Sequence, residues 1–372
     1  MFKSLRYPSG RKSLKTVDAI AHILKLEGVD YLSAFPTTPI IESAASLNIR
    51  PIICRQERVG VGIADGYSRI KNARPPGVFA MQYGPGAENA FAGVATAYSD
   101  GVPMLLLPSG HPSKMEGVFP HFSSMKSLAT VTKFAERLSD KSDVVNTMRR
   151  AFANLKLGRP GPVMVEIPTD IAMAEVQPEE LNKYVPMKKV RTMADPEDIV
   201  SAAHMLVQSS KPMILAGEGV LYATATDELI ELSELLGIPV MTTMGGKSAF
   251  PETHTLSLGS GGVVLSGPAY KYLLKADVVF AIGTSLTKHG MTTNLPPGKT
   301  IIHSTNSDLD IGKDYHVDLP LLGDSKLILR QLFEACKDII PSDTGSSKIV
   351  VENEIKQFRA HWIGEWTPKL TS

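Results

Sequence analysis

The stretch from Arg55 to Arg69 reads Arg-Gln-Glu-Arg-Val-Gly-Val-Gly-Ile-Ala-Asp-Gly-Tyr-Ser-Arg, and it joins an apolar run to a helical pattern. Residues 51–54 predict a strand and residues 58–70 predict a helix. Glu57 lies between them, at the carboxyl end of the strand, which is where α/β sheets place their ligands. The alternative is that Glu57 is an ordinary first-turn residue, favoured there by the helix dipole.

A second segment has the same position relative to its strand. Tyr83-Gly-Pro-Gly-Ala-Glu-Asn89 follows an apolar run at residues 78–81 and begins another helical pattern. Its glycines let the backbone come close to a flat ligand. The alternative interpretation is a tight strand-to-helix turn that binds nothing.

Strands alternate with helices along the chain, which predicts an α/β fold of two doubly wound parallel-sheet domains. We expect a first domain at residues 1–175, a charged linker at 176–192 and a second domain at 193–340. Residues 341–372 are expected to form a linker and a helix containing Trp362 and Trp366. The predicted strands are residues 31–35, 51–54, 78–81, 104–107 and 163–167, then 213–216, 240–243, 278–282 and 300–303.

Composition excludes several classes of function. The 372 residues carry a formal net charge of +1, which gives no electrostatic attraction for nucleic acid or an acidic membrane. The longest apolar runs fall far short of the ~20 residues of a membrane-spanning helix. Cys54 and Cys336 fit neither a disulfide framework nor a zinc site, and this pattern favours a cytoplasmic location.

The two segments, in this order, resemble the pyrimidine-binding domain of thiamine diphosphate (ThDP) enzymes, with acetolactate synthase as the most similar group. Four motifs carry the resemblance: Arg55–Glu57, Gly66–Arg69, Gly84–Asn89 and Gly110–Pro112. The turn Phe35–Thr38 is similar to the first cofactor-contacting loop of the family. The resemblance continues through residues 238–243, 251–254 and 276–283, so it covers nearly the whole chain.

The resemblance implies a role for each of these residues. Glu57 is the expected catalytic residue, which hydrogen-bonds the N1′ nitrogen of the aminopyrimidine and so activates the cofactor. The expected cofactor-binding residues are Pro36, Thr37, Gly84, Pro85, Gly86 and Asn89. The implied reaction is decarboxylation or carboligation of a 2-oxo acid, which is transferase or lyase chemistry.

Two departures from the family pattern concern the substrate. His111 stands where acetolactate synthases have the glutamine of a Gly-Gln-Pro turn, and Pro120-His-Phe-Ser-Ser124 replaces Ala-Phe-Gln-Glu. These positions lie near the substrate in the family, so the resemblance implies substrate contacts for His111 and Phe122. An acyl-CoA or aryl 2-oxo acid is an alternative substrate, and His111 and His121 as surface histidines are the alternative to a substrate role.

The middle domain resembles the part of the family that binds FAD in acetolactate synthases or ADP in oxalyl-CoA decarboxylases. Gly217-Glu-Gly219 follows a strand as a nucleotide-binding turn would, but Tyr222 takes the place of the third glycine. The family's arginine after Ile282 is also missing from Gly283-Thr-Ser285. These departures favour a purely structural middle domain over one that binds FAD.

The family holds Mg²⁺ and the diphosphate in a third domain marked by Gly-Asp-Gly, because these hard groups need oxygen ligands. This chain offers only Gly323-Asp-Ser325. We therefore expect no metal site in this chain. Mg²⁺ is expected to bind through a third domain, which is either missing because the chain is a fragment or present as a separate subunit. The resemblance also implies a homo-oligomer. A nucleotide-binding, regulatory or scaffold module without catalysis is the alternative from another functional class.

Overall fold

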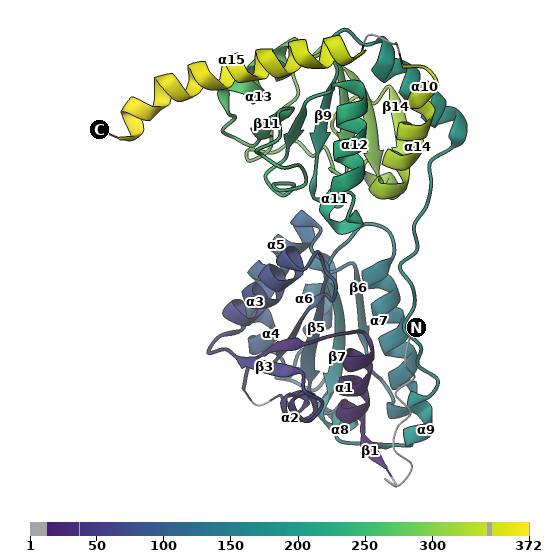
Figure 1. The fold of residues 1–372 in the computed structure, drawn as a ribbon. Coiled ribbons are helices and arrows are strands. Elements are labelled where there is room, and N and C mark those ends of the chain that lie inside the picture. The colour runs from purple at the N-terminus through teal and green to yellow at the C-terminus, as the bar shows by residue number, and fades with distance from the viewer. Residues whose placement is uncertain (1–12, 37, 341–343, 372) are drawn as a thin grey trace. The chain divides into compact units, whose positions relative to one another are not determined.

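The computed structural model describes residues 13–36, 38–340 and 344–371, and the chain divides into two compact units at residues 1–190 and 191–372 (Figure 1). Each unit is built on a six-stranded sheet in which every neighbouring pair of strands is parallel. Helices flank both sheets, which confirms the predicted α/β class with two doubly wound domains.

The first sheet has the strand order β3-β2-β4-β5-β7-β6. Its inner strands β5 and β7 are buried along their whole length, as expected for parallel strands covered on both faces. The direction of strand succession reverses at β2 and β4, so a crevice is expected beyond their carboxyl ends. The strands are β2 (Tyr31–Ala34), β3 (Arg50–Ile53), β4 (Gly77–Met81), β5 (Met104–Gly110), β6 (Phe134–Arg137) and β7 (Val163–Pro168).

Two hydrophobic clusters form the core of the first unit, one under α1, α2 and α7 and the other under α3, α4 and α5. The helices are α1 (Thr16–Leu26), α2 (Ile40–Ser46), α3 (Glu57–Ile70), α4 (Pro85–Asn89), α5 (Phe91–Asp100), α6 (Met125–Leu128), α7 (Val144–Lys156), α8 (Thr169–Ala172) and α9 (Pro178–Leu181). A short antiparallel pair, β1 (Leu14–Lys15) with β8 (Glu175–Val176), joins the two ends of the unit.

The segment predicted as a linker, residues 176–192, packs on the first unit over its first half. Leu181 and Tyr184 are buried in the cluster with α1, and the Tyr184 hydroxyl donates to Glu27 Oε1 at 2.6 Å. The remaining domain boundaries stay predictions, and the structure adds that the chain up to Tyr184 contributes to the first core.

The second sheet has the order β11-β10-β9-β12-β13-β14 and reverses direction between β9 and β12. Its strands are β9 (Met213–Ala216), β10 (Val240–Thr242), β11 (Ser257–Ser260), β12 (Val278–Ile282), β13 (Thr300–Thr305) and β14 (Leu319–Leu322). Its helices are α10 (Pro196–Gln208), α11 (Glu218–Ala223), α12 (Thr226–Leu236), α13 (Gly267–Lys275), α14 (Ser325–Lys337) and α15 (Thr344–Leu370).

The last helix, α15, contains both tryptophans and joins the second unit. Ile355 is 1 % exposed within the second core, and Trp362 lies against Gly267 at the start of α13. No helix among the described residues is long and apolar enough to cross a membrane.

Candidate functional site

The predicted site residues gather at the carboxyl edge of the first sheet. Glu57 begins α3 shortly after β3, Gly84 directly precedes α4 after β4, and His111 directly follows β5. Since β3, β4 and β5 all run in the same direction, their following residues lie at one edge. Residues far apart in sequence are therefore brought together by the parallel topology.

Glu57 is buried, with 4 % of its surface exposed. Asn89 Nδ2 donates a hydrogen bond of 2.9 Å to its Oε2. A Cβ at Gly86 would lie 2.6 Å from Glu57 Oε1 and 2.7 Å from the Gln82 Cβ, so only glycine leaves room for the carboxylate here. Asn89 and Gly86 thus fix the carboxylate between α3 and α4. The structure brings these three predicted residues into one cluster.

The turn before α4 presents backbone rather than side chains. Gly84 has a φ of 54°, a left-handed conformation that glycine adopts without steric cost. Pro85 is the first residue of α4, where its missing N–H costs no hydrogen bond. Pro36 lies exposed in the turn after β2, and Thr37 lies outside the described residues.

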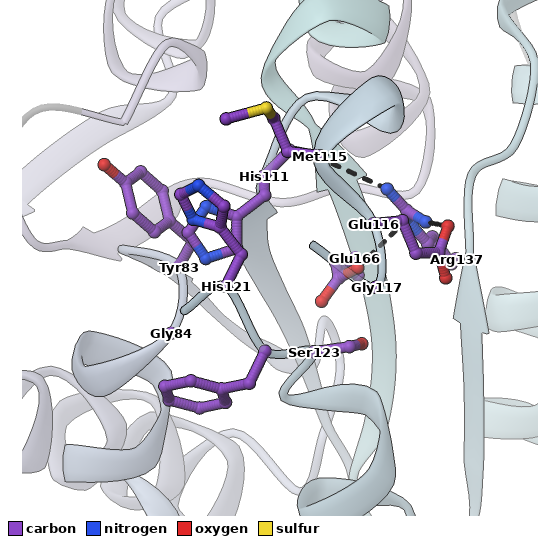
Figure 2. A pocket seen from close by; sticks show the side chains of 11 residues that line it. Tyr83, Gly84, His111, Met115, Glu116, Gly117, His121, Ser123, Arg137 and Glu166 are labelled. Carbon is purple, nitrogen blue, oxygen red and sulfur yellow. Dashed lines mark hydrogen bonds and ion pairs between the residues drawn. The ribbon is translucent and has the colours of Figure 1, made fainter. Parts of the chain in front are cut away.

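A cavity that is partly open to solvent adjoins Gly84 (Figure 2). The ring of His111 lies between those of Tyr83 and His121, with centroids 4.5 Å apart in each pair. Phe122 is 47 % exposed, and a Cβ at Gly84 would lie 3.8 Å from its ring and 3.6 Å from His111 Nε2. The predicted substrate residues His111 and Phe122 therefore line one cavity beside the glycine turn.

The imidazoles of the cavity are available to a ligand. Within the described residues, neither the His111 nor the His121 ring has a hydrogen-bond partner in the protein. Burial lowers the pKa of His111, and the neighbouring His121 and Arg137 lower it further. A neutral imidazole can donate through one nitrogen and accept through the other, so His111 suits a polar uncharged or anionic substrate group.

Several residues that line this cavity were not predicted from the sequence, among them Arg137 and Glu166. Glu166 lies in the middle of the buried strand β7, and burial raises its pKa while Arg137 opposes that shift. Arg137 Nε lies 3.2 Å from Glu166 Oε1 as an ion pair without hydrogen-bond geometry. The signal was a single carboxyl group in an otherwise apolar run at residues 163–168. A charge in such a run needs a partner nearby.

In the second unit the corresponding glycines pack against backbone. A Cβ at Gly217 would lie 2.2 Å from the carbonyl oxygen of Gly283, and Gly219 N donates to that oxygen at 2.8 Å. His303 is fully buried and its Nε2 lies 2.9 Å from the carbonyl oxygen of Thr284. The described part of either unit contains no group of three or more His, Cys, Asp or Glu side chains placed to hold a metal ion.

Comparison with known proteins agrees with this architecture. Residues 14–135 match the family described as "Thiamine pyrophosphate enzyme, N-terminal TPP binding domain", and residues 199–332 match "Thiamine pyrophosphate enzyme, central domain". Together the two matches cover more than half of the chain.

Individual relatives are similar along most of the chain. A probable acetolactate synthase large subunit of Methanocaldococcus jannaschii is 33 % identical over 336 residues, which are 87 % of this chain and 56 % of that protein. A probable acetolactate synthase large subunit of Methanococcus aeolicus is 32 % identical over 360 residues, which are 93 % of this chain and 58 % of that protein. The acetolactate synthase isozyme 3 large subunit of Escherichia coli is 29 % identical over 337 residues, which are 86 % of this chain and 58 % of that protein. The chain thus spans less than two thirds of the length of these relatives.

Proposed function

This chain belongs to the thiamine pyrophosphate enzymes, and we propose that it supplies the aminopyrimidine-binding part of an acetolactate synthase-like enzyme that acts on a 2-oxo acid. The observation that carries the proposal is the setting of Glu57. Its buried carboxylate is held at Oε2 by Asn89 and packs against Gly86 at Oε1. A carboxylate buried and oriented in this way at a sheet edge is suited to exchange a proton with a bound ligand.

The residues present fit the aminopyrimidine ring of ThDP. Gly84 carries no side chain, so a flat ring can approach its backbone, and Gly86 leaves room for the Glu57 carboxylate beside it. Glu57 offers the carboxyl group that a ring nitrogen requires. When bound, ThDP supplies the electron sink that a 2-oxo acid needs in order to lose carbon dioxide.

Each residue of the cluster has a distinct part in the proposal. Asn89 donates to Oε2 of Glu57 and thereby restricts rotation of the carboxylate. The other oxygen, Oε1, accepts no hydrogen bond within the described residues, so it is the atom that holds or moves a proton. A glutamine at position 57 would keep a similar shape but cannot transfer a proton.

The proposal assigns the diphosphate and Mg²⁺ to a third domain or a separate subunit. The Gly323-Asp324 sequence is used locally, because the Asp324 side chain accepts from Lys326 N at 3.2 Å and caps α14. A homo-oligomer and a cytoplasmic location also remain predictions. Cys54 and Cys336 are both free and buried.

The aromatic lining of the cavity favours an aryl 2-oxo acid as a second candidate substrate. Tyr83, His111 and His121 form a continuous row of rings, and Phe122 lines the same cavity. Aromatic side chains pair favourably with an aromatic ligand. Pyruvate is the first candidate because the relatives named above are acetolactate synthases.

The test measures Mg²⁺- and ThDP-dependent consumption of pyruvate and of an aryl 2-oxo acid. The chain is assayed alone and mixed with a diphosphate-binding subunit. Glu57→Gln is expected to lower turnover by about 10²–10⁴-fold, the usual contribution of acid–base catalysis. Glu88→Gln is the control, since Glu88 lies next to Asn89 on α4 but accepts a hydrogen bond from the Ser127 hydroxyl and, within the described residues, makes no hydrogen bond with Glu57.

Three outcomes would count against the proposal. Full activity of Glu57→Gln would remove the role of Glu57. Tight, saturable ThDP binding to the chain alone, measured by isothermal titration calorimetry, would contradict the assignment of the diphosphate to another domain. Inactivity of every mixture with every 2-oxo acid would favour the regulatory or scaffold alternative.

A further inference from the structure

The cavity beside Gly84 is bounded by a long segment between β5 and β6. This segment, residues 111–124, is called the site loop, and it carries His111, His121 and Phe122. Much of it is exposed, and Phe119 has 94 % of its surface exposed. Its core contacts are therefore few over residues 116–120. Something other than burial must hold the loop where its histidines face the glycine turn.

Polar contacts hold the two ends of the site loop. Near its start, Asp170 accepts from Ser113 N, at 3.0 and 3.1 Å to its two oxygens. At its end, Ser124 Oγ donates to the carbonyl oxygen of Gly84 at 3.4 Å, a long hydrogen bond. Neither contact reaches the middle of the loop, which begins at Glu116.

Arg137 supplies a contact to the middle. Its guanidinium forms an ion pair with Glu116 and donates through Nη2 to the carbonyl oxygen of His111 at 3.4 Å (Figure 2). Only 16 % of the Arg137 side chain is exposed, whereas 60 % of the Glu116 side chain is exposed. One largely covered cation thus contacts both the start and the middle of the loop.

Glu166 explains why a cation is fixed at this place. Arg137 and Glu166 are directly paired across β6 and β7, and Arg137 Nε lies 3.2 Å from Glu166 Oε1. The Glu166 side chain is 5 % exposed, so its charge requires a counter-charge from the protein. A Cβ at Gly110 would lie 3.1 to 3.2 Å from the Glu166 side chain, so the glycine gives that carboxyl group room. The buried carboxyl group therefore holds the guanidinium at the end of the sheet.

We propose that Arg137 is a positioning residue, which Glu166 anchors to the sheet and which holds the site loop through Glu116 and the His111 carbonyl. The loop then presents His111 and His121 to the cavity. This inference deepens the proposed function and rests on it for the assignment of the cavity as the substrate site. The contact between Arg137 and the loop itself is testable without cofactor or turnover.

The test is hydrogen–deuterium exchange of the purified full chain, read on peptides from residues 111–124 and on peptides from β5 and β7. Glu116→Gln keeps the Arg137–Glu166 pair and releases only the loop. We expect exchange in the loop to become about two- to fivefold faster, the effect of losing a largely exposed ion pair, with β5 and β7 unchanged. Arg137→Met should accelerate loop exchange by about tenfold or more, and Arg137→Lys should restore part of the protection.

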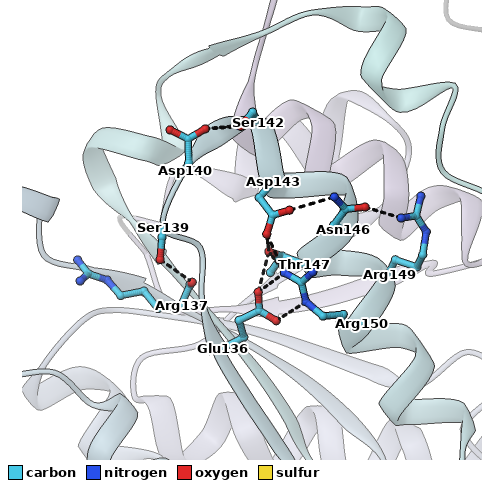
Figure 3. A network of polar contacts seen from close by, with 10 residues as sticks. All are labelled: Glu136, Arg137, Ser139, Asp140, Ser142, Asp143, Asn146, Thr147, Arg149 and Arg150. Atoms are coloured by element: carbon cyan, nitrogen blue, oxygen red, sulfur yellow. Dashed lines mark hydrogen bonds and ion pairs between the residues drawn. The ribbon is translucent and has the colours of Figure 1, made fainter.

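Arg150 provides a matched control. It pairs with Glu136 on β6 through Nε at 2.8 Å and with Asp143 at 2.7 Å, and it joins α7 rather than the site loop (Figure 3). Arg150→Met removes an equivalent arginine and should leave loop exchange unchanged.

Two results would overturn the inference. The first is unchanged loop exchange in both Glu116→Gln and Arg137→Met. The second is an acceleration of exchange throughout the first unit in Arg137→Met, together with unchanged loop exchange in Glu116→Gln. That result would make Arg137 a general stabilising residue. In the reconstituted enzyme, Glu116→Gln should raise KM about two- to fivefold with kcat retained, because the loop must be ordered on binding. If loop exchange is faster in the variants but no mixture shows turnover, the positioning role of Arg137 is supported and only the proposed function is contradicted.

Discussion

The two units place a glycine turn at the same edge of similar parallel sheets, yet different atoms occupy the space beside each turn. In the first unit, the space against Gly86 holds the side-chain carboxylate of Glu57, and a cavity opens beside Gly84. In the second unit, the space against Gly217 and Gly219 holds the backbone of Gly283. Both turns lie close to the point where strand order reverses, where α/β sheets bind ligands.

This difference shows that a glycine turn has two uses at a sheet edge. A glycine can make room for a functional side chain and a ligand, or it can let two loops of the same chain come together. Gly219 N donates to the carbonyl oxygen of Gly283, and Gly283 N donates to that of Ser304, so the second turn is tied into its own unit. A purely structural middle domain that binds no FAD stays a prediction.

The largest effect is expected from Gly217→Ala. Its Cβ would lie 2.2 Å from a backbone oxygen, and backbone cannot move aside as a side-chain end can. We expect a loss of about 3 kcal/mol of unfolding free energy. Both tryptophans lie in α15, so tryptophan fluorescence during urea titration reports on the second unit. Gly290→Ala, with no atom within 4 Å of its Cβ, is the control and should change stability by less than about 0.5 kcal/mol.

A smaller loss of stability is expected from Gly86→Ala. Its Cβ would meet Glu57 Oε1 at 2.6 Å and Gln82 Cβ at 2.7 Å, and the carboxylate end can rotate away. We expect about 2 kcal/mol of destabilisation, measured by amide exchange of β4, together with loss of 2-oxo acid turnover. Retention of full turnover would mean that the position of Glu57 does not matter.

The two units should also differ in how their stability depends on pH. Burial lowers the pKa of His303, so the unfolded chain binds a proton near pH 6.5 that the folded chain does not. Stability from this group is present above the unfolded pKa and is lost as the pH falls below about 6.5 towards the folded pKa. The unfolding free energy should fall by at most about 1.4 kcal/mol for each pH unit below this point.

The measurement is the urea midpoint of tryptophan fluorescence between pH 7.5 and 5. His303→Gln should flatten the curve over this window, whereas His111→Gln in the more open cavity should change it little. Identical curves for the wild type and His303→Gln would show that His303 titrates normally.

The smallest effect, and the only stabilising one, is expected from Gly62→Ala. Gly62 is exposed in α3 with no atom within 4 Å of its Cβ, and alanine favours a helix interior by about 0.5–1 kcal/mol. Gly60 on the same helix is the contrast, because its Cβ would lie 2.2 Å from the Phe79 ring and Gly60→Ala should destabilise. A loss of stability in Gly62→Ala that depends on protein concentration would indicate a second copy packed on this face.

The sequence predicted the central strands and missed several edge strands. Strands β4, β5, β7, β9 and β12 are buried on both faces, so their apolar runs are readable without a structure. Strands β6, β11 and β14 lie at sheet edges and are only partly buried, so they carry mixed residues such as Phe-Ala-Glu-Arg at 134–137. Pairing with a neighbouring strand, which sequence periodicity does not record, makes them part of the sheets.

The candidate site divides in the same way. Glu57, the Gly84–Gly86 turn and Asn89 follow predicted strands, so the sequence by itself placed them at one edge and related them to a family. Only the tertiary structure decided that Asn89 holds Glu57, that Arg137 and Glu166 join the cavity, and that Gly217 packs on Gly283. The reason is physical: strand and helix patterns are local along the chain, whereas a hydrogen bond, an ion pair or a filled space depends on which distant residues the fold brings within a few ångströms.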